Sequence, residues 1–136
     1  MSNKLTEHKL LVLQPSGEIA NCLLTVQISD VCSINLEGLS AGELKETASS
    51  LYDCLCSIRM KIEPQGFRLL CSASRIDAFS SPMLRQALAA KRVYILRMGF
   101  QARKEDWVDI FSPAAQEQVG TVTQQAVFLD KWLKSL

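Results

Sequence analysis

Two short apolar runs decide how the fold is read: Phe67-Arg-Leu-Leu-Cys71 and Arg92-Val-Tyr-Ile-Leu-Arg-Met98. Each has the length and the apolar, partly β-branched and aromatic content that are typical of a buried strand. Between them, Ser81-Pro82 offers an N-cap residue followed by proline at the first helical position, which predicts a helix through Ala90. Strand, helix and strand in this order predict a βαβ unit with parallel strands and a right-handed crossover.

Upstream of this unit, the sequence predicts an N-terminal β-hairpin. Residues 9–13 and 19–28 are rich in Leu, Val, Ile and Thr, and the turn residues Pro15-Ser16-Gly17 separate them. Residues 31–36 form a further strand candidate. Its inward side is expected to carry Cys32, Ile34 and Leu36.

Helices are predicted in the middle and at the end of the chain. Ser40-Ala-Gly-Glu43 matches a capping box and predicts a helix start. Glu63-Pro64 should end this helix, because proline cannot continue the hydrogen-bond ladder. A similar pattern, Thr121-Val-Thr-Gln124, predicts a helix that runs to the C-terminal residue. The apolar stripe expected for the first helix consists of Leu44, Ala48, Leu51, Leu55 and Ile58.

These elements predict one domain over residues 1–136, of the α/β (α+β) class. We expect a mixed sheet with the N-terminal hairpin, one βαβ unit and about three helices. A length of 136 residues is the size of one ordinary domain, and 48% hydrophobic residues are ample for its core. Glu105 and Asp106, which precede the apolar segment 107–111, predict a helical turn followed by an edge strand.

Charge and hydropathy exclude several classes of partner. Lys and Arg number 15 and Asp and Glu 14, so the formal net charge is +1 and no global field attracts nucleic acid. The apolar run at residues 10–13 is shorter than the ~7–15 residues of a signal-peptide core. No run approaches the ~20 apolar residues of a membrane helix. We therefore expect a cytoplasmic protein with neither a membrane nor a nucleic-acid partner.

No catalytic or metal-binding signature is present. His8 is the single histidine, which excludes metal sites built on two or three imidazoles. The five cysteines are an odd number, and Cys54 and Cys56 lack the Cys-x-x-Cys spacing of zinc sites, so we expect reduced, buried thiols. The glycines are scattered singly and form no phosphate-binding loop. The sequence thus predicts a protein that is not an enzyme, with no cofactor and no metal.

Two segments supply the candidate partner-binding residues. Arg75 and Asp77 follow the first strand of the expected βαβ unit, where open α/β sheets bind ligands. The second segment has six basic and no acidic residues between Arg85 and Lys104, and then an acidic and aromatic run, which favours an acidic protein partner. Structural roles remain open, with Arg75 and Asp77 as a loop pair and Trp107 as a core residue. The candidates of the second segment are Arg103, Lys104, Glu105, Asp106 and Trp107.

A family resemblance rests on two stretches, Arg92-Val-Tyr-Ile-Leu-Arg-Met-Gly99 and Ala102-Arg-Lys-Glu-Asp-Trp-Val-Asp-Ile-Phe-Ser-Pro113. These stretches resemble small bacterial proteins, and the chain is similar in size and style to immunity proteins of bacterial toxin systems such as contact-dependent growth inhibition. The resemblance covers residues 68–136. It implies a cytoplasmic protein that binds one cognate toxin, usually a nuclease, and neutralises it by blocking its active site.

Two other functions stay open. A small ligand-binding domain or enzyme would use an anion site in the loop from Ser72 to Ser81, formed by Arg75, Asp77 and the helix start at Ser81. An adaptor, a chaperone-like subunit or a homodimer would instead associate through the predicted edge at residues 107–111, and an exposed apolar patch would favour this alternative.

Overall fold

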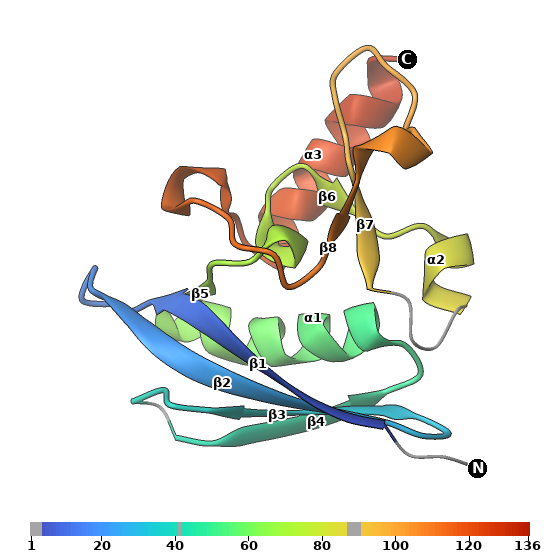
Figure 1. Cartoon of the computed structure of the whole chain (residues 1–136). Helices are drawn as coiled ribbons and strands as arrows, with labels where there is room; N and C mark the ends of the chain where they lie inside the picture. The colour runs from blue at the N-terminus through green and yellow to red at the C-terminus, as the bar shows by residue number, and fades with distance from the viewer. Residues whose placement is uncertain (1–3, 41, 87–90) are drawn as a thin grey trace.

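The computed structural model describes residues 4–40, 42–86 and 91–136, and in this part of the chain the elements form two antiparallel sheets and three α-helices (Figure 1). The larger sheet has the strand order β4-β3-β2-β1-β5 and the smaller one β6-β7-β8. The strands are β1 Lys4–Leu13, β2 Ile19–Ile28, β3 Cys32–Glu37, β4 Leu44–Ala48, β5 Arg68–Leu69, β6 Ala78–Phe79, β7 Arg92–Ile95 and β8 Trp107–Asp109. The helices are α1 Leu51–Ile62, α2 Pro82–Gln86 and α3 Val122–Lys134, with 3-10 turns η1 Glu63–Gln65, η2 Ser72–Ser74, η3 Lys104–Asp106 and η4 Gln116–Gln118.

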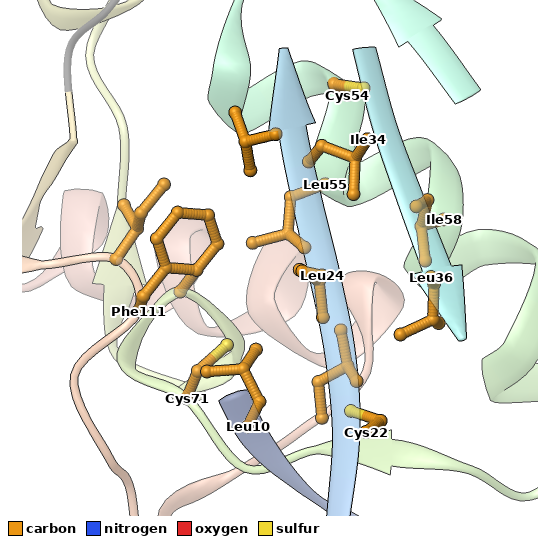
Figure 2. Packing of buried hydrophobic residues seen from close by; sticks show 14 of the residues in the cluster. Leu10, Cys22, Leu24, Ile34, Leu36, Cys54, Leu55, Ile58, Cys71 and Phe111 are labelled. Atoms are coloured by element: carbon orange, nitrogen blue, oxygen red, sulfur yellow. The ribbon is translucent and has the colours of Figure 1, made fainter. Parts of the chain in front are cut away.

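Helix α1 is the middle layer of the molecule. Figure 1 shows it lying along one face of the five-stranded sheet, with the three-stranded sheet and α3 on its other side. One hydrophobic cluster fills the space around it, and Figure 2 shows Leu55 of α1 in this cluster with Leu24 of β2 and Ile34 of β3. These three side chains are almost completely buried. The α+β class and the number of helices agree with the sequence-based prediction.

The predicted N-terminal hairpin is confirmed. Strands β1 and β2 pair along their full length, from Lys4 opposite Ile28 to Leu13 opposite Ile19. Gly17 adopts a φ of 91° in the turn between them, a conformation that glycine allows without steric cost. Strand β3 then points Cys32, Ile34 and Leu36 inward as expected, and each of them is 0% exposed.

The predicted helix start at Ser40 is wrong. Residues 44–48 form strand β4, which pairs with β3, and α1 begins only after Ser50, whose hydroxyl accepts a hydrogen bond from the backbone N–H of Asp53. A spacing of four places Leu44 and Ala48 on one side of a strand as well as on one side of a helix, so the spacing did not distinguish the two structures. The predicted helix end is confirmed, because α1 ends at Ile62 and Glu63-Pro64 begin a 3-10 turn.

The predicted βαβ unit and mixed sheet are also wrong, because every strand pair among the described residues is antiparallel and the two apolar runs lie in different sheets. Strand β5 pairs with β1, where the N–H of Leu70 donates to the carbonyl of Leu11 over 2.9 Å. Strand β7 pairs with β6 and β8.

Most of the remaining boundaries follow the sequence. Pro82 opens α2, and the hydroxyl of Ser81 accepts from the N–H of Leu84, although residues 87–90 of this predicted helix lie outside the described residues. The turn η3 and the edge strand β8 match the prediction for residues 105–111 in kind. The capping box at Thr121 is confirmed. Helix α3 ends at Lys134 and not at the C-terminal residue as predicted; it buries Gln125 and Trp132, whereas Val127 and Leu133 are exposed.

A buried polar network joins α1 to the segments above it. The side chain of Arg59 is fully buried and donates to the carboxylate of Glu63, the carbonyls of Ala73 and Gly120, and the amide oxygen of Gln125. Because each of the three guanidinium nitrogens donates to an acceptor, the network satisfies the rule that buried charges are paired and hydrogen-bonded. It fixes η2 and the start of α3 against α1, and thereby the position of the second sheet.

Candidate functional site

Arg75 and Asp77 are paired with each other. The Nε and Nη2 atoms of Arg75 donate to the two carboxylate oxygens of Asp77 over 2.9 and 2.8 Å, and both side chains are about three-quarters buried. The carbonyl of Arg75 accepts from the amide of Gln125 over 2.7 Å. This bidentate geometry is strong and leaves the guanidinium engaged within its own loop. It agrees with the structural role of a loop pair.

Three serines of the loop from Ser72 to Ser81, at positions 72, 74 and 80, are buried. Ser72 is buried and its hydroxyl lies 2.7 Å from that of Ser112, while Ser74 is completely buried. Since Arg75 is held by Asp77, an anion bound in this loop would first have to displace that carboxylate. The arrangement offers little support for the anion-site alternative.

The second group of candidate residues gathers on one surface, formed by the connection between β7 and β8. We call it the β7–β8 surface and define it as Arg97, Phe100, Arg103, Lys104, Asp106 and Trp107. Arg97 and Arg103 both point a nitrogen at Oδ2 of Asp106, each over 3.3 Å. Hydrogen bonding from Arg103 and the positive charges of the two arginines lower the pKa of Asp106. Asp106 is therefore ionised at neutral pH, and the two guanidinium groups outnumber it.

Three aromatic rings, in contact one after another, pack beside this cluster. The ammonium group of Lys104 lies 5.4 Å from the centre of the Trp107 ring, within the range of a cation–π contact. Trp107 in turn meets Tyr94 of β7 edge to face, and Tyr94 stacks on Phe79 of β6. The Nε1 atom of Trp107 is buried without a hydrogen-bond partner among the described residues. Trp107 is thus partly a core residue and partly a support for Lys104.

The turn at residues 97–100 extends the surface and is fixed to the C-terminal helix. The indole N–H of Trp132 donates to the carbonyl of Phe100, and the N–H of Gly99 donates to the hydroxyl of Ser135, both over 2.9 Å. The Phe100 side chain remains 62% exposed, with the guanidinium of Arg97 at 5.5 Å from its ring centre. An exposed aromatic ring on an anchored turn is a typical contact point for a protein partner.

The structure therefore separates the predicted site residues into two groups. Arg103, Lys104, Asp106 and Trp107 are brought together, and Glu105 lies exposed in the same turn. Among the described residues, the side chains of Arg75 and Asp77 make no hydrogen bond or ion pair with this group. Arg97 and Phe100 were not among the predicted site residues. The sequence signal that could have found them is Gly99, because a glycine after a strand indicates a turn. In the structure, Gly99 has a φ of 81°.

The positions of the cysteine thiols and of the single histidine indicate structural roles. All five cysteines are free, as predicted, and four of them are buried. Burial raises the pKa of Cys22 and of Cys54 to about 11, so both are protonated at neutral pH and poor nucleophiles. His8 stacks on Phe111 with ring centres 4.2 Å apart, and burial lowers its pKa. Within residues 4–40, 42–86 and 91–136, no group of three His, Cys, Asp or Glu side chains is arranged to hold a metal ion.

The described helices include none that is long and apolar enough to cross a membrane. Comparison with models of known protein families gives no match. No curated protein matches the sequence significantly either. The case for a function of this chain therefore rests on the geometry of the β7–β8 surface.

Proposed function

We propose that the protein is an immunity protein, which binds a cognate bacterial toxin in the cytoplasm and neutralises it by blocking its active site. The resemblance of residues 68–136 to such proteins suggests this role. The observation that supports it is the β7–β8 surface, where two arginines share one carboxylate beside an exposed phenylalanine. This surface is the part of the chain that we assign to toxin contact.

The charge of the surface defines the partner's chemistry. Arg97 and Arg103 present guanidinium N–H groups, only part of which are used by Asp106, and both side chains are about half exposed. Guanidinium groups bind carboxylates in a bidentate geometry, and charge complementarity steers association. Phe100 adds apolar contact area at the centre. The toxin is therefore expected to present carboxylates around an apolar pocket.

The same charge restricts how a nuclease toxin would be blocked. A nuclease binds phosphates through a basic cleft, and that cleft would repel Arg97 and Arg103. The β7–β8 surface would instead contact acidic residues beside the cleft and cover it sterically. A homodimer formed through the edge strand β8 would bury part of this surface, so in our proposal the toxin-binding form is the monomer.

Growth protection tests the proposal. The tagged protein is used to capture its partner from lysate of the source organism, and the partner is identified by mass spectrometry. If the partner is the C-terminal region of a large secreted protein, that region is expressed alone in a bacterial host. The proposal expects it to stop growth and co-expression of this chain to restore growth. A captured region that is harmless, or that still kills in the presence of this chain, contradicts the proposal.

Charge-reversal variants then test the surface. Arg97→Glu and Arg103→Glu, separately, should lower toxin affinity by about tenfold or more, because each adds repulsion at the contact. Lys45→Glu is the matched control, since it reverses a charge on an exposed residue of β4 in the other sheet. Reversing the charge of Asp106 should also weaken toxin binding, because Arg97 and Arg103 would lose the carboxylate that holds them in position. Unchanged affinity in all the surface variants would remove the β7–β8 surface from the interface. Retention of a metabolite in place of a protein would favour the ligand-binding alternative.

A further inference from the structure

A second candidate site lies between the three helices. A cavity of about 200 Å³ opens where α1, β6 and α3 meet, with α2 at its rim. It joins residues that are distant in the sequence, and a neighbouring depression of about 370 Å³ shares two of them, Asp53 and Arg85. The residues that matter for its chemistry are Tyr52, Asp53, Phe79, Arg85 and Leu129.

One part of the cavity wall is apolar and uncharged. Phe79 and Leu129 line it together with the ring of Tyr52. The hydroxyl of Tyr52 is hydrogen-bonded to the thiol of Cys56, and burial raises the pKa of both groups, so both are neutral at physiological pH. An apolar group of a ligand would find no charge to displace at this wall.

The rim of the cavity carries two opposite charges that are only weakly paired. Nη1 of Arg85 lies 4.0 Å from Oδ1 of Asp53, and the two side chains are 40% and 42% exposed. The guanidinium sits 5.4 Å above the Tyr52 ring centre and makes no hydrogen bond to another described residue. The other oxygen of Asp53 accepts from the hydroxyl of Ser50 over 2.8 Å, which holds the carboxylate in place. One oxygen and several N–H donors thus remain available at the rim.

We propose that this cavity binds the zwitterion of an α-amino acid with an apolar side chain. The carboxylate pairs with Arg85, the ammonium group pairs with Asp53, and the side chain packs against Phe79 and Leu129. A simple anion would meet the charge of Asp53, and a simple cation that of Arg85, whereas a zwitterion satisfies both. A volume of about 200 Å³ lies below the ~300–1,000 Å³ of pockets for drug-sized ligands, which restricts the ligand to a small molecule. This site does not rest on the proposed toxin binding.

Isothermal titration with three matched probes tests this site in the full chain. The probes are L-leucine, 4-methylpentanoate, which lacks the ammonium group, and 3-methylbutylamine, which lacks the carboxylate. L-leucine should bind saturably at one site, and each analogue about tenfold or more weakly. If no apolar α-amino acid, from valine to phenylalanine, binds saturably at millimolar concentration, the proposal is overturned. A 4-methylpentanoate affinity equal to that of L-leucine would also overturn it, because Asp53 would then play no part.

Variants test whether L-leucine binds at the rim of the cavity. Arg85→Gln and Asp53→Asn should each lower the affinity for L-leucine by about tenfold or more. Arg92→Gln is the matched control, since Arg92 is a surface arginine of β7, 50% exposed against 40% for Arg85, and its partner is Asp109, outside the cavity. Asp53 also helps to cap α1, so its variant is first checked by thermal unfolding, and Arg85→Gln carries the test if Asp53→Asn does not fold. Full L-leucine binding by Arg85→Gln contradicts the proposal.

Discussion

The Nε atom of Arg59 lies 2.9 Å from Oε2 of Glu63, and the two side chains are 0% and 6% exposed. The other carboxylate oxygen of Glu63 accepts the N–H of Val122, the first residue of α3. One ion pair at the end of α1 therefore also determines where the C-terminal helix begins. Since the second sheet lies on the side of α1 opposite the larger sheet (Figure 1), we expect the pair to control its placement.

Removing one member of this pair should strongly destabilise the fold. Arg59→Met leaves the Glu63 carboxylate buried without its partner and removes the donor to the carbonyl of Gly120 and to the amide oxygen of Gln125. We expect the free energy of unfolding to fall by about 3–5 kcal/mol, as measured by urea denaturation. The control is Lys61→Met, which breaks the exposed pair of Lys61 with Glu46 and should cost about 0–1 kcal/mol. Equal stability of the two variants would contradict the role given to Arg59.

The two tryptophans should respond differently to replacement by phenylalanine. Trp132→Phe removes the donor to the carbonyl of Phe100, whereas Trp107→Phe removes a buried N–H that has no partner among the described residues. An unpartnered buried donor costs about 1–3 kcal/mol, and its removal offsets the packing lost with the larger ring. In urea denaturation, Trp107→Phe should therefore cost about 1 kcal/mol less than Trp132→Phe. A larger loss for Trp107→Phe would show that packing dominates at this position.

The parts of the fold that local chemistry determines could be predicted from the sequence. The β1–β2 hairpin has a turn around Gly17 between two runs rich in Leu, Val and Ile, and α3 begins at a capping box. Residues 44–48 could not be assigned this way, because Leu44 and Ala48 fit a helix and a strand equally well. Their pairing with β3 depends on tertiary contacts, which override local propensity.

The candidate site could be predicted only where its residues are close in sequence. Arg103 and Asp106 are three residues apart and were found, whereas Arg97 reaches the same carboxylate from the end of β7. The burial of Arg59 could not be foreseen, since its acceptors come from residues as distant as Gly120. The pairing of β5 with β1, in place of the predicted βαβ unit, could not be foreseen either, because most of the N-terminal half of the chain separates these two strands.

A pair of glycine substitutions should separate backbone strain from crowding. Gly66 and Gly42 have almost equal positive φ values, 98° and 99°, so alanine is strained at both. A Cβ at Gly66 would also lie 3.1 Å from the Cβ of Pro15, while at Gly42 it would meet nothing within 4 Å. We expect Gly42→Ala to cost about 1–2 kcal/mol and Gly66→Ala measurably more, by urea denaturation. Equal costs would mean that Pro15 moves aside without penalty.

The stability of the fold should depend on pH through His8. Burial lowers the pKa of His8 below its ordinary value of 6.5, the nearby charge of Lys91 lowers it further, and Asp109 raises it. The unfolded chain therefore binds a proton more readily than the folded one, so stability is lost as pH falls from about 6.5 through the folded pKa.

Urea denaturation of the wild-type chain and of His8→Gln at several pH values between about 5 and 7.5 checks this dependence. The wild-type chain should lose more stability toward the acidic end than His8→Gln, which cannot take up the proton. Asp106 does not interfere, because its two arginine neighbours lower its pKa from the ordinary value of 3.8, further away from the pH range of this experiment. Identical pH slopes for the two proteins would mean that His8 is solvated equally in the folded and unfolded states, in spite of its stacking on Phe111.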